Sequence, residues 1–270
     1  MRKINKDLEN VPSSLVVRDE NSTHQRRLEL IDNKGYIDEN RYNSRYKTPD
    51  IKNELVKIYH NKCAFCEQKV EQFHIEHFRP KKIYYWLAYS WDNLILSCPY
   101  CNINKSTNFE VTGKRAKCPS TKNLNNINTI SREIYDLQEK PKLINPEVTD
   151  PTPHLIFEKD GNITSANEAY AYTIRTCRIN RKYLNDERRK ILNEFKGCVE
   201  SELYEAKTIE DQKRSLEVLI RCFKNKAMNE DCEYTAFRNY ALTHNWLNDI
   251  INSVIKEVSV NSTTPFDKLK

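Results

Sequence analysis

The sequence predicts an α+β protein that is mostly helical and contains a small zinc-stabilised module packed against a helical domain. Three observations support this fold class: only 4 glycines among 270 residues, a C-terminal region rich in Ala, Leu, Ile, Glu, Lys and Arg, and two Cys-x-x-Cys pairs around short aromatic and β-branched runs. Scarce glycine disfavours a barrel or sandwich. The helix-forming composition and the paired cysteines favour helices beside a metal-nucleated module.

Four segments are expected along the chain. They are an N-terminal helical segment over residues 1–59, the module over 60–120, a linker and β-hairpin over 121–166, and a C-terminal helical domain over 167–270. A length of 270 residues allows one or two compact domains, and we expect two.

Periodicity and turn residues support these segments. The N-terminal segment has helical patterns over Thr23 to Asn33 and over Asp50 to His60, the second opened by Pro49. Asp160-Gly161 between two apolar runs predicts a hairpin turn. The stretch from Asn167 to Val258 predicts three or four amphipathic helices.

Neither a membrane span nor a secretory signal is expected. The first residues, MRKINKDLENVPSS, lack an apolar core, and no later stretch approaches the roughly 18 apolar residues of a membrane helix. We therefore expect a cytoplasmic protein without membrane contact. In such a protein, cysteines bind metal or stay reduced more often than they form disulfides.

Four of the nine cysteines form two tight pairs. Cys63-x-x-Cys66 and Cys98-x-x-Cys101 are separated by 31 residues, and each pair can direct two thiolates at one ion. Zinc prefers four such ligands in closed structural sites, so we predict a structural Zn²⁺. A four-cysteine iron site for electron transfer is an alternative. The other five cysteines are interpreted as small core residues: Cys118, Cys177, Cys198, Cys222 and Cys232.

Residues suited to phosphodiester hydrolysis lie between and just after the cysteine pairs. Hydrolysis requires a base for the attacking water and a divalent ion that stabilises the leaving oxygen. His77 is the candidate base, and Glu76 and Asn102 offer oxygen ligands for Mg²⁺ or Mn²⁺. Asn93 is expected to orient His77 through a hydrogen bond. His74 is interpreted as a structural residue of the first strand, with metal or phosphate contact as the alternative.

This ordered set resembles the HNH, or ββα-metal, endonuclease family, with His77, Asn93 and Asn102 in the three motif positions. The resemblance implies a ββα-metal module in which His77 activates water. It also implies that Glu76 and Asn102 bind the catalytic ion and that Asn93 positions the loop carrying His77. Asparagine in place of the commoner last histidine favours Mg²⁺ or Mn²⁺ over Ni²⁺ or Co²⁺.

A wider stretch, roughly residues 58 to 195, is similar to the PtuB-like HNH nuclease subunits of Septu-type and some retron-linked bacterial anti-phage systems. The stretch includes IEHFRPK, WLAYSWDNLILSCPYCNINKS and LINPEVTDPTPHLIFEKDG. This similarity implies a bacterial cytoplasmic defence effector and a partner, an ABC-type ATPase of the PtuA-like class.

The module is also where most of the basic charge lies. Lys plus Arg exceeds Asp plus Glu by 44 − 38 = 6 over the chain, and residues 62–122 contain ten basic and five acidic residues. We expect six basic side chains to contact nucleic acid, with a solvated charged surface as the alternative. They are Arg79, Lys81, Lys82, Lys105, Lys114 and Arg115.

An aromatic run follows the candidate base. Its members are Tyr84, Tyr85, Trp86, Tyr89 and Trp91. We expect this run to pack the module against the helical domain, with stacking on unpaired bases as the alternative.

The sequence thus predicts a metal-dependent endonuclease that hydrolyses nucleic acid, DNA in preference, as the effector of an anti-phage system. An RNA-cleaving toxin, for example one that cuts tRNA, would use the same residues. A rival of another class is a non-catalytic zinc module that binds nucleic acid or protein through its basic surface.

Overall fold

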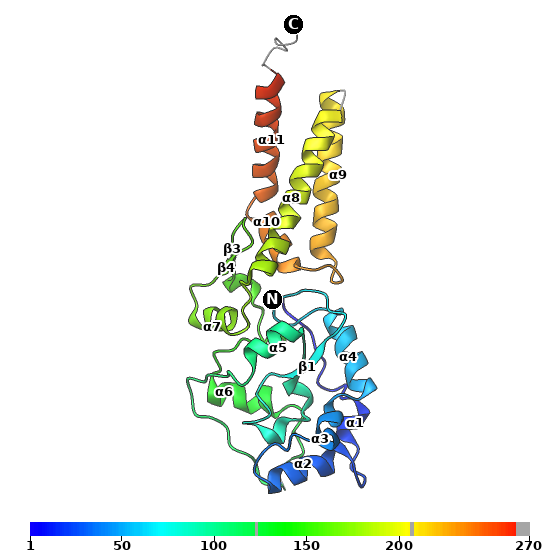
Figure 1. Ribbon diagram of the computed structural model, residues 1–270, viewed down its shortest axis with the longest axis vertical. Helices are drawn as coiled ribbons and strands as arrows, with labels where there is room; N and C mark the ends of the chain where they lie inside the picture. Colours follow the sequence, from blue (N-terminus) through cyan, green and yellow to red (C-terminus); the bar gives the residue numbers. More distant parts are fainter. Residues whose placement is uncertain (122–123, 206–207, 263–270) are drawn as a thin grey trace. The chain divides into compact units, whose positions relative to one another are not determined.

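A computed structural model describes residues 1–121, 124–205 and 208–262 (Figure 1). The chain divides into two compact units, the first formed by Met1–Ile156 with Ile163–Asn180 and the second by Phe157–Asn162 with the chain from Arg181 onward. Residues 122–123, within the predicted linker, and 206–207 and 263–270, within the predicted C-terminal domain, lie outside the described residues. The regular structure of the described residues consists of helices and four short strands, which confirms the predicted mostly helical α+β class.

The units divide the chain differently from the predicted segments, since Phe157–Asn162 of the predicted hairpin belongs to the second unit. Helix α7 (Glu168–Thr176), placed by sequence in the C-terminal domain, belongs to the first unit. The hydroxyl of Tyr172 accepts a hydrogen bond from the backbone N–H of Glu110 at 3.2 Å, and the buried Thr173 hydroxyl accepts one from Ile144 at 2.8 Å. These bonds attach α7 to Glu110 inside the predicted module and to Ile144 beyond it.

The first unit combines short helices with one small sheet. Its other α-helices are α1 (Ser13–Val16), α2 (Thr23–Asp32), α3 (Asn40–Asn43), α4 (Pro49–Tyr59), α5 (Pro99–Lys105) and α6 (Asp136–Glu139). Its 3-10 helices are η1 (Ser44–Tyr46), η2 (Tyr85–Leu87), η3 (Trp91–Asn93) and η5 (Thr152–His154), and η4 (Ser131–Tyr135) is a π-helical turn.

The two predicted N-terminal helices are present within a residue of their expected ends. The side chain of Ser22 caps α2 by accepting a hydrogen bond from the Gln25 N–H, which is one of the donors that a helix start leaves unpaired. Pro49 opens α4, where its missing N–H costs nothing, and His60 ends α4 in the left-handed conformation at φ 53°.

The sheet of the first unit is an antiparallel pair, β1 (His74–His77) and β2 (Leu94–Ser97). His74 pairs with Ser97 and His77 with Leu94. Every residue of β2 is buried, and α5 follows immediately after Cys98. The order strand, strand, helix is the ββα arrangement expected of the module.

Most of the aromatic run packs inside the first unit. Tyr84, Trp86, Tyr89 and Trp91 are all buried. The Tyr89 hydroxyl donates to the carbonyl of Tyr42 at 3.1 Å, and the Trp91 indole donates to the carbonyl of Asp7 at 3.1 Å. These two hydrogen bonds join the module to the N-terminal segment of the same unit.

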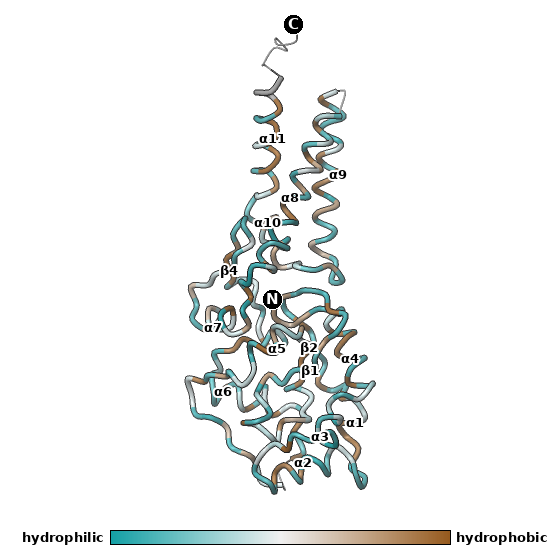
Figure 2. The backbone as a smooth tube through the Cα atoms, viewed as in Figure 1, coloured by the Kyte–Doolittle hydropathy of each residue, from teal (hydrophilic) through white to brown (hydrophobic). Residues whose placement is uncertain are grey.

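The second unit is built on long helices. They are α8 (Lys182–Glu205), α9 (Ile209–Met228), α10 (Thr235–Thr243) and α11 (Trp246–Ser262). Helix α8 contacts both α9 and α11. Hydrophobic and hydrophilic residues alternate along these helices (Figure 2), as expected of amphipathic helices that bury one face.

The predicted number of helices after Asn167 is wrong. Five, α7 to α11, are found within the described part of this region, against the three or four expected. Helices α7 and α10 have only nine residues each, and the turn around Tyr234, at φ 54°, separates α9 from α10. The sequence lacks glycine or proline at these breaks, so composition alone gave no sign of them.

The predicted hairpin is present as β3 (Ile156–Phe157) and β4 (Ile163–Thr164). Gly161 lies in its turn at φ 90°, a conformation that side chains rarely adopt. A Cβ atom there would lie 2.1 Å from the carbonyl oxygen of Asn185, so this position also requires the absence of a side chain.

None of the helices within the described residues combines the length and apolar character that a membrane span requires.

The prediction that the scattered cysteines are core residues is correct for Cys177 and wrong for the other four. Cys177 is buried, but Cys198 and Cys222 are exposed on α8 and α9, and Cys118 and Cys232 are half-buried. Helical composition does not reveal which face of a helix is covered.

Candidate active site and zinc centre

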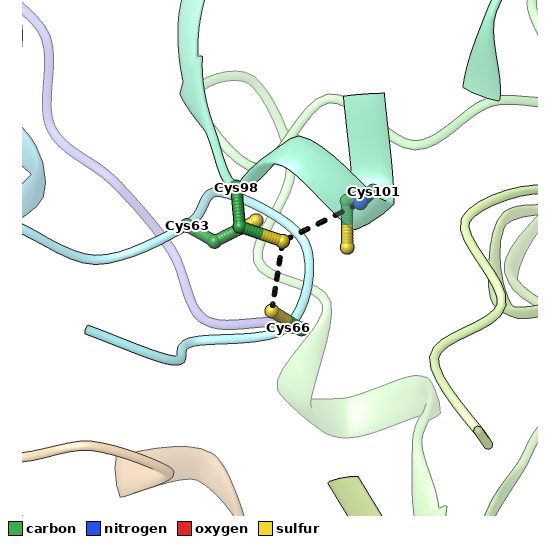
Figure 3. Close-up of side chains that lie close together, drawn as sticks. All are labelled: Cys63, Cys66, Cys98 and Cys101. Carbon is green, nitrogen blue, oxygen red and sulfur yellow. Dashed lines mark hydrogen bonds between the residues drawn. The ribbon is translucent and has the colours of Figure 1, made fainter. Parts of the chain in front are cut away.

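Four buried thiols converge at the start of α5 (Figure 3). Cys63 and Cys66 come from the loop before β1, Cys98 caps α5, and Cys101 lies in its first turn. Their sulfur atoms all lie within 4.8 Å of one another, and Sγ of Cys66 is 3.8 Å from Sγ of Cys98. Tetrahedral zinc with bonds of about 2.3 Å separates its sulfur ligands by about 3.8 Å. The predicted cysteines therefore form one cluster whose donors and spacing fit structural zinc.

The imidazole of His77 is buried and oriented by the backbone. Its Nε2 atom lies 2.9 Å from the carbonyl oxygen of Ala88, so Nε2 carries the proton and Nδ1 carries the lone pair. The ring of Tyr46 meets the His77 ring edge to face, with centroids 4.6 Å apart. Burial, with a smaller effect from the positive charge of Lys81, lowers the pKa of His77 to about 3. The ring is therefore neutral at physiological pH, with its lone pair on Nδ1.

Glu76 is held by a lysine of α5. Oε1 of Glu76 accepts a hydrogen bond from Nζ of Lys105 at 2.6 Å, and the same ammonium donates to the carbonyl of His77 at 2.8 Å. The Lys105 side chain is fully buried. Burial raises the pKa of Glu76, and the charge of Lys105 opposes this shift. Lys105 thus fixes both residues of the Glu-His dipeptide.

Asn102 lies one helical turn before Lys105 on α5. Its amide nitrogen is 2.7 Å from Nδ1 of His74. This pairing directs the amide N–H toward His74 and leaves the Oδ1 atom as the acceptor of the Asn102 side chain. The alternation of a strand puts His74 and Glu76 on one face of β1, so Asn102 and Lys105 contact two residues of the same face.

Asn93 is fully buried, and its side chain forms hydrogen bonds with the backbone of the loop that follows His77. Its Oδ1 accepts from the backbone N–H of Arg79 at 2.7 Å, and its amide nitrogen donates to the carbonyls of Arg79 and Leu87, both at 3.1 Å. Its side-chain bonds go to backbone groups rather than to the His77 ring. Because Leu87 precedes Ala88, Asn93 also holds the turn whose carbonyl orients His77.

The six basic residues expected at nucleic acid occupy different environments. Arg79 and Lys105 are buried, Lys81 is half-buried, and Lys82, Lys114 and Arg115 are exposed. The expectation of phosphate contact is wrong for Arg79 and Lys105, because carboxylates inside the unit bind both of them. Nε of Arg79 donates to Glu139 at 2.8 Å and its NH2 group donates to Asp136 at 2.7 Å.

Lys81 is linked to the candidate base through the Tyr46 side chain. Its Nζ donates to Oδ1 of Asn43 at 2.8 Å and to the hydroxyl of Tyr46 at 2.9 Å. Burial lowers the pKa of Lys81 to about 8. Lys81 is therefore a cation tied to the ring that packs on His77.

The site also depends on residues that sequence reasoning missed. Tyr46 lies 31 positions before His77, and Glu139 lies beyond the predicted module. Besides Arg79, the buried Glu139 carboxylate accepts hydrogen bonds from the Tyr84 hydroxyl at 2.6 Å and the Ala116 N–H at 2.7 Å. Nothing in their spacing marks these residues, and the Ala88 contact is made by a backbone carbonyl that every residue has.

Comparison with known proteins agrees with this geometry. Residues 63–108 match the model of the HNH endonuclease family. The match contains the four clustered cysteines, β1, β2 and α5, so this part of the chain is similar to the HNH endonucleases.

Parts of the chain that extend beyond this match are similar to two curated proteins, each named Septu protein PtuB. It is 30% identical over 211 residues to the protein of Bacillus mycoides strain KBAB4, which covers 70% of this chain and 64% of that protein. It is 30% identical over 117 residues to the protein of Bacillus thuringiensis, which covers 42% of this chain and 35% of that protein. The chain therefore spans less than two thirds of the length of either relative.

Proposed function

We propose that this chain is a metal-dependent endonuclease that hydrolyses phosphodiester bonds, with DNA as the favoured substrate. The observation that carries the proposal is the orientation of His77. Its Nε2 hydrogen bond to Ala88 leaves a neutral Nδ1 in a domain of the HNH family. A positioned neutral imidazole is the group that abstracts a proton from water at physiological pH.

In the proposed reaction, the water proton passes to Nδ1 of His77 while the water oxygen forms the new bond to phosphorus. The P–O bond opposite the incoming oxygen breaks. Lys105 holds the His77 backbone and the Glu76 carboxylate in place, and Asn93 holds the turn that ends at Ala88. Positioning of this kind removes much of the entropic cost of bringing the reactants together.

Glu76 and Asn102 are the proposed ligands of a divalent ion. A carboxylate oxygen and an amide oxygen are hard donors, and Mg²⁺ is often bound by one or two protein groups together with water and phosphate oxygens. When bound, such an ion would act as a Lewis acid that stabilises the leaving oxygen. The four-cysteine cluster is the proposed site of a separate structural Zn²⁺.

The similarity to Septu protein PtuB supports a role in anti-phage defence in the bacterial cytoplasm. It also supports a partner, which we propose is an ABC-type ATPase of the PtuA-like class. DNA is the substrate proposed first and RNA is the alternative, since hydrolysis by His77 and one metal ion depends little on the sugar.

The test is cleavage of plasmid DNA and total RNA by the purified full-length protein, alone and with any co-purified ATPase. Wild type, His77→Ala and, as matched control, the exposed-histidine variant His244→Ala are compared with Mg²⁺, Mn²⁺ or EDTA. We expect cutting that requires metal and His77 and is unchanged in His244→Ala. Cutting of RNA alone would identify the toxin alternative. No cutting in any lane, while nucleic acid still binds, would favour a non-catalytic zinc module.

A further inference from the structure

A pocket of about 340 Å³ lies beside the candidate active site in the first unit. Its lining includes Tyr46, Lys47, Lys52, Phe73, His74 and Asn102. These residues come from the N-terminal segment, from β1 with the residue before it, and from α5. Three of them, Tyr46, Lys47 and Lys52, lie outside the stretch that matches the HNH family.

The pocket shares two residues with the catalytic arrangement. Tyr46 lines the pocket and packs its ring on His77 with centroids 4.6 Å apart. Asn102, the proposed metal ligand, also lines the pocket and is paired with His74. A group bound in this pocket would therefore contact the ring that packs on the proposed base and would lie next to the proposed metal ligand.

The chemistry of the lining suits a nucleotide. Lys47 and Lys52 are exposed cations, and none of the described lining residues is acidic. Nζ of Lys52 lies 5.1 Å from the centre of the Phe73 ring, and Nζ of Lys47 lies 5.5 Å from that of Tyr46. Ammonium groups beside aromatic rings provide both contacts that proteins make to unpaired nucleotides, namely charge pairing with phosphate and stacking on the base.

We propose that this pocket binds one unpaired nucleotide of the substrate strand next to the cleaved bond. Lys47 and Lys52 contact its phosphates, and Phe73 stacks on its base. The volume lies near the lower end of the range for small-ligand sites, about 300 to 1,000 Å³, which suits a single nucleotide rather than a longer segment. This inference rests on the proposed function, and it assigns substrate binding to two lysines outside the stretch that matches the family and to Phe73 within it.

The experiment measures binding of fluorescent single-stranded DNA and RNA oligonucleotides by anisotropy, as a function of salt. The full-length His77→Ala protein, without added divalent ion, is the parent, and Lys52→Ala and Phe73→Ala are added to it. Lys57→Ala is the matched control, because Lys57 is an exposed lysine of the same helix and does not line the pocket.

We expect Lys52→Ala to lower the slope of log affinity against log salt by about 0.7, the value for one phosphate contact on a single strand. Phe73→Ala should weaken binding about tenfold without changing that slope, because stacking releases no counterions. The Lys57→Ala control should stay within about twofold of its parent. Preference for DNA or for RNA identifies the substrate.

Equal affinities and salt slopes for Lys52→Ala, Phe73→Ala and Lys57→Ala would overturn the inference. The same three substitutions are then tested for cleavage with His77 intact. His77-dependent cleavage in wild type, undiminished in Lys52→Ala and Phe73→Ala, would reject the pocket and keep the proposed function. Absence of His77-dependent cleavage in wild type would reject the proposed function itself, whatever the binding data show.

Discussion

The ammonium of Lys105 bridges two consecutive residues of the candidate site. Its Nζ atom lies 2.6 Å from Oε1 of Glu76 and 2.8 Å from the carbonyl oxygen of His77, with the lysine side chain fully buried. A buried charge is tolerated only when it is paired and hydrogen-bonded, and both conditions are met here. Lys105 is therefore a positioning residue for the proposed metal ligand and the proposed base.

Replacing Lys105 by Met should destabilise the protein by about 3 to 5 kcal/mol, because the buried Glu76 carboxylate loses its partner. Urea denaturation of the full-length protein measures the change. The control is Lys57→Met on the exposed face of α4, where a surface substitution should cost about 0.5 kcal/mol or less. Equal losses in the two variants would show that the Lys105 pair has no special role.

Asn102→Ala should raise the Mg²⁺ concentration needed for half-maximal cleavage by about tenfold or more, because the proposed oxygen ligand is removed. Asn104→Ala, at a half-buried position of the same helix that does not line the pocket, is the control. The zinc content of both variants should equal that of wild type. An unchanged Mg²⁺ requirement in Asn102→Ala would remove Asn102 from the proposed ligand set.

The pH dependence of cleavage should reflect the buried state of His77. Burial lowers its pKa to about 3, below the ordinary 6.5, so the neutral base persists in the folded protein as the pH falls. The acid limb of kcat/KM should therefore have its midpoint below pH 6.5. A pH–rate profile at saturating Mg²⁺ tests this expectation, and a midpoint at or above pH 6.5 would contradict it.

Cys98→Ser should release the metal and unfold the region around β2 and α5, since metal-binding free energy serves as folding free energy in small zinc sites. Cys198→Ser, at an exposed cysteine of α8, should keep both metal and fold. Metal analysis and circular dichroism follow the two variants. Full zinc content with an unchanged melting temperature in Cys98→Ser would exclude the four-cysteine site.

Asp92 makes stability depend on pH. Burial raises its pKa from 3.8 to about 7, while Arg132 and the N–H of Ser131 act in the opposite direction. In the unfolded chain the Asp92 carboxyl loses its proton above about pH 4, whereas in the folded chain it keeps the proton up to about pH 7. The free energy of unfolding should therefore fall as the pH rises from about 4 to about 7, by about 4 kcal/mol at most.

Asp92→Asn should remove this contribution. Denaturation at pH 5 and at pH 8 measures it, and we expect the difference between the two free energies of unfolding to be smaller in Asp92→Asn than in wild type. An identical difference in both proteins would show that Asp92 ionises normally.

Sequence alone was sufficient for the features that spacing determines. The two cysteine pairs predicted one cluster, and the hydrophobic periodicity after Asp50 predicted α4. It was insufficient where partners come from distant segments. Lys105 was expected to contact nucleic acid, but it is buried, and its burial depends on where α5 packs on β1. The hydrogen bond that orients His77 is made by the backbone carbonyl of Ala88, which no side chain marks in the sequence. Tertiary contacts of this kind have no local periodicity.

Glu139 determines how long a segment must be if the module is moved into another protein. Its carboxylate accepts hydrogen bonds from Arg79, Tyr84 and Ala116, two of which lie inside the family match at 63–108. A graft limited to that match would carry a buried arginine without its counter-ions and a base without the Tyr46 ring. A segment for transplantation should therefore begin before η1 and end after α6, and a fusion designed from the motif borders alone should be less stable because its buried arginine lacks partners.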